Sequence, residues 1–144
     1  MKLLILNGPN LNLLGMRQPE VYGKTTLPEI EAMCHLTARE LGVGLEFRQS
    51  NHEGVLIDWI HEAKGRIDAI IINAGAYTHT SIAIMDALLS VEIPTIELHL
   101  SAISKREPFR KLSYIEKASI AQIMGHGPDG YPMAMKAAVQ HLKA

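Results

Sequence analysis

The chain has 144 residues, of which 47% are hydrophobic, with a formal net charge of -1 and an isoelectric point near 6.6. This length matches one ordinary domain, large enough to bury roughly two-thirds of the surface that the unfolded chain exposes. The near-neutral charge gives no bulk electrostatic reason to expect nucleic acid or a membrane as partner.

Cysteine content and hydropathy bear on location. Cys34 is the single cysteine, so an intrachain disulfide is excluded and an oxidising compartment is not indicated. The N-terminal apolar run is too short for a signal peptide, and no stretch approaches the ~20 apolar residues of a spanning helix. We therefore expect a cytoplasmic protein.

The apolar pattern predicts alternating strands and helices. Leu3 to Leu6 form a continuous apolar run closed by Asn7-Gly8-Pro9, which is typical of a buried strand. Apolar residues recur at helical spacing from Leu27 to Leu41, and Gly42 is well placed to end that helix. The further predicted elements are, in chain order, a strand over 43–48, a helix with apolar positions from 56 to 63, a strand over 67–72, a helix over 81–91, a strand over 95–100, a weaker strand over 119–124 and a helix over about 128–142.

This alternation also predicts the fold. A helix between two parallel strands makes a right-handed crossover and packs on the sheet, so the pattern favours a parallel sheet covered on both faces. We predict an α/β fold, a flavodoxin-like, doubly wound, five-stranded parallel sheet in a single domain over residues 1–144. Thr78 or Thr80 is expected to cap the helix over 81–91. The poorly patterned stretch 101–117 is too short for a second domain and is expected to be a functional loop.

Polar side chains follow the ends of the predicted strands. In an open parallel sheet, ligands bind outside the carboxyl ends of the strands, near the point where strand order reverses. Taken singly, a polar loop residue is more often a solvated surface residue. The convergence of four loops nevertheless favours a site, and its residues are Asn10, Asn12, Arg17, Tyr22, Asn51, His52, Asn73, Thr78, His79, Glu97, His99, Ser101, Arg106 and Arg110.

Glu97 and His99 are two residues apart on a predicted strand, so their side chains face the same side. A carboxylate beside a histidine can hold its tautomer and raise its basicity, as a general acid or base requires. The spacing therefore indicates acid–base chemistry at the end of this strand.

Asp86 interrupts the apolar stretch SIAIMDALLSV, where it falls between Ile82 and Leu89 on one helical stripe. An unpaired carboxylate buried there would be costly. We therefore expect a cation, a hydrogen-bonding ligand or a neighbouring subunit beside it. An intrachain ion pair and an oligomer interface both stay open as explanations.

Two further patterns carry less weight. GHGPDG, residues 125–130, matches G-x-G-x-x-G, but an acidic ribose partner about 20 residues later is missing from the sequence. Pro128 at a helix start is the simpler explanation. A metal site from His79, Glu97 and His99 lacks a fixed-spacing ligand motif. We expect neither a dinucleotide nor a metal.

Four stretches together resemble type II 3-dehydroquinate dehydratase, namely ILNGPNLNLLGMRQPEVYG, QSNHEGVLIDWIHEA, INAGAYTHTSIAIMDAL and IELHLSAISKREPFR. The likeness spans nearly the whole chain, and the flavodoxin-like fold of that family agrees with the predicted sheet. The resemblance implies that 3-dehydroquinate loses water to give 3-dehydroshikimate, by anti elimination through an enolate and without a cofactor, a metal or a covalent imine.

The matching positions imply roles for individual residues. Tyr22 would be the base and Arg17 its activator, since lowering a tyrosine pKa from about 10 to ~7 needs roughly 4 kcal/mol, which an adjacent guanidinium can supply. His99 would be the general acid, oriented by Glu97, and Asn10 would hold a water against the enolate oxygen. The implied substrate-binding residues are Asn73, His79, Asp86, Leu100, Ser101 and Arg110, with Asp86 presented to the site of a neighbouring subunit.

The resemblance also implies a dodecamer built of trimers, with 3-dehydroquinate as the only other partner. After Ser101 the family usually has asparagine and, two residues later, histidine followed by Ala-Arg-Glu-Glu, whereas this chain has Ala102, Ser104 and Lys105-Arg106-Glu107-Pro108. That departure motivates an alternative, a non-catalytic flavodoxin-like binding module for a cyclic hydroxy-carboxylate. A flavin or nucleotide binder on the same fold is a third hypothesis, and it lacks a dedicated phosphate loop.

Overall fold

Five parallel strands form one sheet in the computed structural model, which describes residues 1–16, 20 and 23–144. The strands are β1 (Lys2–Asn7), β2 (Gly44–Gln49), β3 (Ala69–Asn73), β4 (Thr95–His99) and β5 (Ala121–Met124). Their order in the sheet is β2-β1-β3-β4-β5, and every neighbouring pair is parallel. The strand order therefore reverses between β1 and β3, as it does in the predicted doubly wound fold, which is confirmed.

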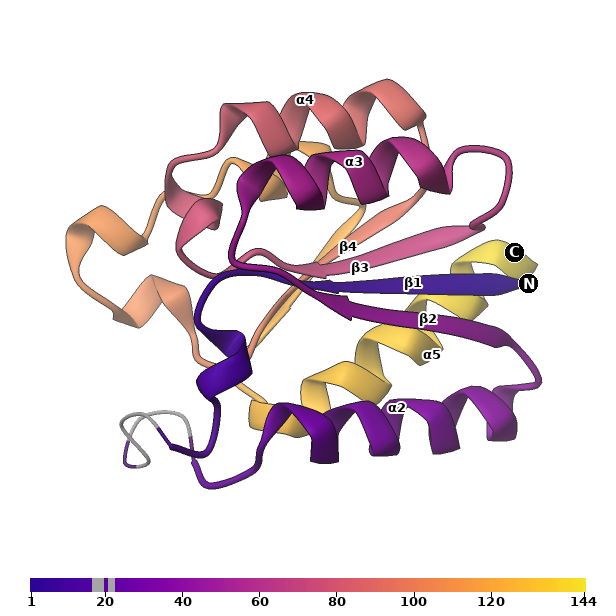
Figure 1. Cartoon of the computed structure of the whole chain (residues 1–144), viewed down its shortest axis with the longest axis horizontal. Coiled ribbons are helices and arrows are strands. Elements are labelled where there is room, and N and C mark those ends of the chain that lie inside the picture. The colour runs from indigo at the N-terminus through magenta and orange to yellow at the C-terminus, as the bar shows by residue number, and fades with distance from the viewer. Residues whose placement is uncertain (17–19, 21–22) are drawn as a thin grey trace.

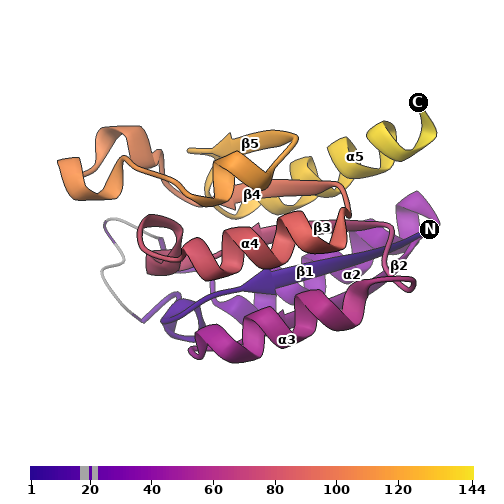
Figure 2. The same ribbon diagram turned by 90° about the horizontal axis from the view of Figure 1, so that it is seen from above.

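Helices cover both faces of the sheet (Figures 1 and 2). Helices α2 (Leu27–Leu41) and α5 (Gly130–Lys143) lie on one face, and α3 (Glu53–Ala63) and α4 (Ile82–Val91) lie on the other. The carboxyl ends of the strands meet at the edge of the sheet opposite both chain termini, at the left in Figure 1. Loops that leave these ends are therefore brought together at one edge.

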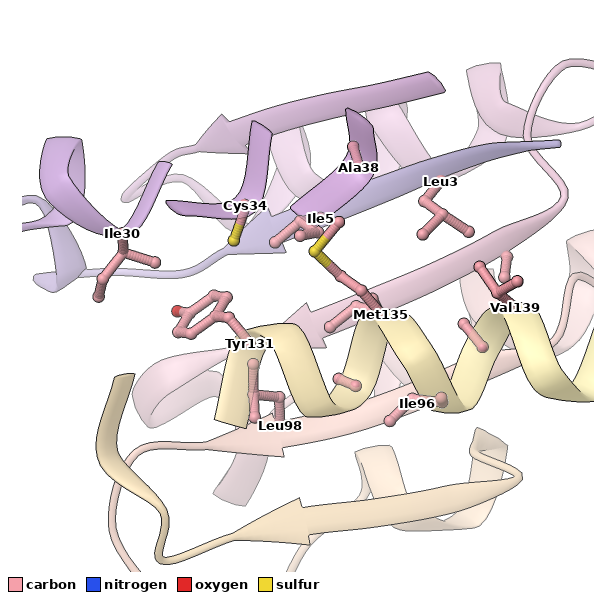
Figure 3. Packing of buried hydrophobic residues seen from close by; sticks show 14 of the residues in the cluster. Leu3, Ile5, Ile30, Cys34, Ala38, Ile96, Leu98, Tyr131, Met135 and Val139 are labelled. Carbon is pink, nitrogen blue, oxygen red and sulfur yellow. The ribbon is translucent and has the colours of Figure 1, made fainter. Parts of the chain in front are cut away.

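Strand alternation divides the core into two clusters. Leu3 and Ile5 of β1 pack toward α2 and α5, where Cys34 is also buried (Figure 3), whereas Leu4 and Leu6 pack toward α3 and α4. Successive side chains of a strand point to opposite faces, so a strand covered on both faces is apolar throughout. The apolar run at 3–6 thus predicts its burial correctly. Burial raises the pKa of the Cys34 thiol to about 12, which leaves it an inert core residue.

The ends of α2 follow from local chemistry. Thr26 accepts a hydrogen bond from the Glu29 amide, and the Glu29 carboxylate in turn accepts one from the Thr26 amide, which together form a capping box. Gly42 ends the helix with φ of 69°, a left-handed conformation that glycine adopts at little cost. The predicted end of this helix is confirmed.

The predicted cap of α4 is wrong. Ser81 caps the helix, because its Oγ accepts a hydrogen bond of 2.9 Å from the Ile84 amide. Thr78 and His79 belong to a short 3-10 turn, η2 (Gly75–His79), which places Thr78 too early in the chain to reach the first turn of α4. Among the described residues, the buried Thr78 hydroxyl has no hydrogen-bond partner.

Some predicted boundaries shift where a turn uses part of the apolar run. Ile67 precedes β3, because its amide bonds to the Ala63 carbonyl at the end of α3. Pro128 lies in a 3-10 turn, η6 (Gly127–Asp129), so α5 begins at Gly130 rather than at 128. Within the described residues, none of the helices is long and apolar enough to cross a membrane.

Candidate active site

A cavity of about 210 Å³ opens at the carboxyl ends of the strands, beside the point where the strand order reverses. Its walls come from the loops after β1, β3 and β4. This volume suits a small metabolite better than a dinucleotide. The lining residues are Pro9, Asn10, Leu11, Leu14, Asn73, Gly75, Ala76, His79, His99, Leu100, Ser101, Ile103, Arg106 and Arg110.

The loop after β1 reaches the cavity because it packs tightly on the end of β3. The Gly8 amide donates a hydrogen bond of 2.8 Å to the Asn73 carbonyl. A Cβ at position 8 would lie 2.3 Å from the Ala74 carbonyl oxygen, so only glycine fits there. Asn10 follows with φ of 69°, in the left-handed region that asparagine tolerates, and its amide donates to the Asn51 side chain.

The predicted pairing of Glu97 with His99 is present. The two side chains point to the same side of β4, and Nε2 of His99 lies 2.5 Å from a carboxylate oxygen of Glu97. Glu97 is fully buried and His99 nearly so. An ionised carboxylate only accepts hydrogen bonds, so Nε2 carries the proton and Nδ1 is the ring nitrogen left for chemistry. His99 lines the cavity, whereas Glu97 does not line the cavity and contacts His99.

Asn73 is held by a buried polar network that is completed by Tyr131 of α5, which Figure 3 shows among the core residues. The Tyr131 hydroxyl donates to Oδ1 of Asn7 at 2.6 Å and accepts from Nδ2 of Asn73 at 3.3 Å. Asn7 and Asn73 are register partners on β1 and β3, on the face that packs against α5. Burial raises the pKa of Tyr131, so its hydroxyl keeps its proton and remains a donor.

The segment after β4 contributes two guanidinium groups to the cavity wall. Arg106 donates to the Ser101 hydroxyl at 3.2 Å, and Arg110 donates to Glu107 at 3.0 Å. A hydrogen bond from its own backbone, with a further one from Arg110, holds the pKa of Glu107 below its ordinary value. The two arginines and the hydroxyl are suited to binding a carboxylate or several hydroxyl groups.

His79 reaches the cavity from η2 and is oriented by one backbone group. Its Nδ1 lies 2.7 Å from the Leu112 carbonyl oxygen and must therefore carry a proton. The other ring nitrogen, Nε2, is then the one left for a ligand in the cavity that His79 lines. The structure thus brings together in the cavity wall seven of the residues with a predicted catalytic or binding role, which are Asn10, Asn73, His79, His99, Leu100, Ser101 and Arg110.

The expectation that Asp86 is buried on a stripe with Ile82 and Leu89 is wrong for the single chain. Asp86 is exposed, and Ile82 and Leu89 are 50% and 51% exposed. Helix α4 instead packs its other apolar stripe into the core, and that stripe consists of Ile84, Ala87, Leu88 and Val91. Asp86 therefore does not reach the cavity of its own chain.

The described residues do not include the predicted base and its activator. Arg17 and Tyr22 lie outside the described residues. Within the described part of the chain, no three His, Cys, Asp or Glu side chains are grouped so as to hold a metal ion.

Sequence reasoning missed three contributors to the site and left a fourth without a role. Arg106 was placed at the rim without a role, whereas Ser113, Gln122 and Tyr131 were not considered at all. The three missed residues act through Glu97 or Asn73 from elements far along the chain. The one available signal was the unusual polarity of Asn7, Asn73 and Glu97 inside apolar strands, since buried polar groups require partners.

Comparisons with known proteins agree on one family. The family described as Dehydroquinase class II matches residues 1–139. A protein of Dinoroseobacter shibae named 3-dehydroquinate dehydratase is 58% identical over 144 residues, which cover 100% of this chain and 96% of that relative. A protein of Verticillium alfalfae named catabolic 3-dehydroquinase is 53% identical over 142 residues, which cover 99% of this chain and 95% of that relative. The crystal structure of the type II dehydroquinase from Butyrivibrio crossotus superposes with a TM-score of 0.94 at 45% identity, covering 96% of this chain and 97% of that chain.

Proposed function

Because this chain belongs to the class II dehydroquinase family, we propose that it is a 3-dehydroquinate dehydratase, which removes water from 3-dehydroquinate to give 3-dehydroshikimate. The observation that carries the proposal is the buried pair of Glu97 and His99 beside a cavity with cationic walls, in a chain that the family matches over 139 residues. The relatives that are named for this activity align with the chain along nearly their whole length.

The proposed elimination needs one base and one acid. The phenolate of Tyr22 takes a proton from the carbon beside the ketone, and the electron pair of that bond forms an enolate. Arg17 favours the phenolate through its positive charge. The enolate then collapses to the conjugated enone while the carbon–oxygen bond breaks on the opposite face, and protonated His99 gives its proton to the departing hydroxyl, which leaves as water. Solvent restores both protonation states.

Further side chains of the cavity bind the substrate. Asn10 holds a water against the enolate oxygen, where it stabilises negative charge as that charge forms. The Ser101 hydroxyl and the amides of Leu100 and Ser101 bind the carboxylate, a role supported by the guanidinium of Arg106 on the same hydroxyl. The substrate hydroxyls are bound by Asn73, His79 and Arg110, which all line the cavity.

The assembly is part of the same proposal. Asp86 is exposed on α4 and does not line the cavity of its own chain, and the half-exposed Ile82 and Leu89 lie on the same helix. An exposed apolar pair around a carboxylate fits burial against another copy of the chain. We propose that trimers place Asp86 at the site of a neighbouring subunit and that these trimers build a dodecamer.

A spectroscopic assay tests the activity directly. Purified protein mixed with 3-dehydroquinate should produce ultraviolet absorbance of the conjugated enone, at a rate proportional to protein concentration. His99→Ala prepared in parallel controls for a contaminating dehydratase, because a contaminant would leave the rate unchanged. Tight binding of the substrate without any growth of the signal would instead favour the non-catalytic binding module suggested by the altered stretch 102–108.

A further inference from the structure

The carboxylate of Glu97 is fully buried and receives three hydrogen bonds from described residues. His99 and the Ser113 hydroxyl both donate to Oε2, at 2.5 Å and 2.6 Å, and Nε2 of Gln122 donates to Oε1 at 2.9 Å. Buried carboxylates are stable in the charged form when their oxygens are satisfied by donors. Both oxygens of Glu97 are therefore occupied, and its plane is fixed from two sides.

The direction of the bond from Ser113 is fixed as well. Its Oγ accepts a hydrogen bond of 3.1 Å from the Glu116 amide, at the start of the short turn η5 (Ile115–Ala118). A hydroxyl has one proton, and an oxygen that accepts from an amide directs that proton to another acceptor. Ser113 is buried and does not line the cavity, so it acts on Glu97 and not on a ligand.

These contacts have an electrostatic consequence for His99. Each donor that stabilises the negative charge of Glu97 makes the carboxylate a weaker partner for the positive charge of protonated His99. Protonated His99 then gives up its proton more readily, as a general acid must. Among the described residues, the other titratable or charged side chains that line the same cavity are His79, Arg106 and Arg110.

We propose that Ser113, together with Gln122, is a positioning residue that fixes Glu97 and thereby sets the orientation and acidity of His99. The kinetic consequences of this assignment rest on the proposed dehydration. The effect of Ser113 and Gln122 on the His99 ring rests on the hydrogen-bond geometry. Neither residue lines the cavity. Their contribution is to the acid step and not to binding.

The first test compares Ser113→Ala with Ser119→Ala. Ser119 is a matched control in the same segment, because its hydroxyl donates to the Ile115 carbonyl and not to Glu97. We expect Ser113→Ala to lower kcat on the order of tenfold, a part of what general acid catalysis contributes, with KM changed less than about twofold because binding groups are intact. The alkaline limb of its pH–rate profile should move to higher pH.

A second readout does not depend on activity. The titration of the His99 ring, followed by NMR, should have its midpoint shifted upward by about one pH unit in Ser113→Ala, because a hydrogen bond to a charged group has been removed. Ser119→Ala should leave the midpoint unchanged. If the unmodified protein showed no dehydration, the proposed function would fail while this titration still decided the role of Ser113.

Two more variants guard against misfolding. Ser113→Thr keeps the hydroxyl and should restore kcat and the titration midpoint. Gln122→Met removes the donor on the other oxygen from the exposed edge strand β5 and should shift the midpoint in the same direction. The proposal is overturned if Ser113→Ala matches Ser119→Ala in both kcat and midpoint, or, where Ser113→Ala does not fold, if Gln122→Met leaves the midpoint unchanged.

Discussion

Among the described residues, His99 is held at one ring nitrogen, and this limits what it can do. Glu97 occupies Nε2, so the proposed acid step uses Nδ1. The proposed base, Tyr22, belongs to a different loop and acts at an earlier step. At the scale of single residues, the proposed mechanism therefore separates into a base step and an acid step that different side chains control, and the acid step can be removed alone.

Removing the base should abolish both steps. We expect Tyr22→Phe to lower the rate of enone formation about 10³-fold, within the range that a positioned base contributes, and to leave the folding transition unchanged. Circular dichroism and the absorbance assay measure the two quantities. Tyr114→Phe, which removes the hydroxyl of a tyrosine that does not line the cavity, is the control and should stay active. Full activity in Tyr22→Phe would exclude this residue as the base.

Removing the acid should leave the first step intact. In heavy water, His99→Ala should still exchange the substrate proton beside the ketone for deuterium, because Tyr22 is present, while dehydration slows by about 10²-fold or more. Mass spectrometry of recovered substrate and the absorbance assay give the two rates. Loss of exchange and dehydration in equal measure would contradict a separate acid role for His99.

At the scale of elements, the site depends on how closely the loop after β1 approaches the end of β3. Gly8 and Asn73 meet there through a backbone hydrogen bond, and Asn73 also faces the cavity. The elements at the edges of the sheet contribute in a different way. Glu46 of the edge strand β2 forms ion pairs with Lys2, Arg48 and Arg66, so charged side chains surround that edge.

The close approach predicts a strong effect of one methyl group. Gly8→Ala should destabilise the fold by about 3 kcal/mol, the upper end of what overpacking costs, because the new Cβ would overlap the Ala74 carbonyl oxygen. Urea unfolding measures this. Gly54→Ala is the matched control on α3, where an added Cβ would meet nothing within 4 Å, so it should be neutral or slightly stabilising. Equal stability of the two variants would contradict the packing described here.

The ion pairs of Glu46 predict a pH dependence of stability. Hydrogen bonds from Arg66 and Lys2 lower the pKa of Glu46 from 4.5 to about 2. A folded-state pKa below the unfolded value stabilises the protein fully above the unfolded value, and that stabilisation is lost as the pH falls from about 4.5 toward 2. The partners are largely exposed, so the effect should be only about 1 kcal/mol.

The comparison of unfolding free energies at pH 5 and pH 3 tests this dependence. Glu46→Gln should lose less stability over that range than the unmodified protein. Salt at about 1 M should reduce the difference between the two proteins, because exposed pairs are screened. An identical pH dependence in both proteins at low salt would show that Glu46 is not stabilised by its neighbours.

At the scale of the whole molecule, the fold gathers residues from distant parts of the chain and leaves one helix face uncovered. The reversal of strand order opens the cavity between the loops after β1 and β3, to which β4 adds His99. Helix α4 meanwhile exposes Ile82 and Leu89 beside Asp86. The proposed trimer connects these two features, because it would bring the exposed carboxylate of one chain to the cavity of another.

Mixing two inactive variants tests the shared site. Tyr22→Phe and Asp86→Ala subunits, dissociated together and reassembled, should regain activity at about a quarter of the sites, as random assortment of subunits predicts. Absorbance measures the activity, and light scattering measures the size of the assembly. The same variants mixed without dissociation serve as the control. No recovery in properly sized assemblies would contradict a site shared through Asp86.

The sequence by itself determined the kinds of element, their order and the edge of the sheet at which the site forms. Apolar periodicity is a local property, and parallel strands deliver their carboxyl ends to one edge, so Asn10, Asn73 and His99 could be placed together without coordinates. The spacing of Glu97 and His99 likewise predicted their contact, which is confirmed. Element ends were less well predicted, because turns such as the one at Ile67 use residues that are also good strand formers.

Only the tertiary structure decided which groups support the site and which face of α4 is buried. Tyr131 reaches Asn7 across 124 positions of the chain, and Gln122 reaches Glu97 from the next strand of the sheet, so both contacts depend on packing that no local pattern encodes. Helix α4 is apolar around most of its circumference, and the stripes through Leu88 and through Asp86 compete for burial at the same periodicity. The stripe that contains no charged residue packs on the sheet, because burying an unpaired carboxylate would cost more free energy than exposing two aliphatic side chains.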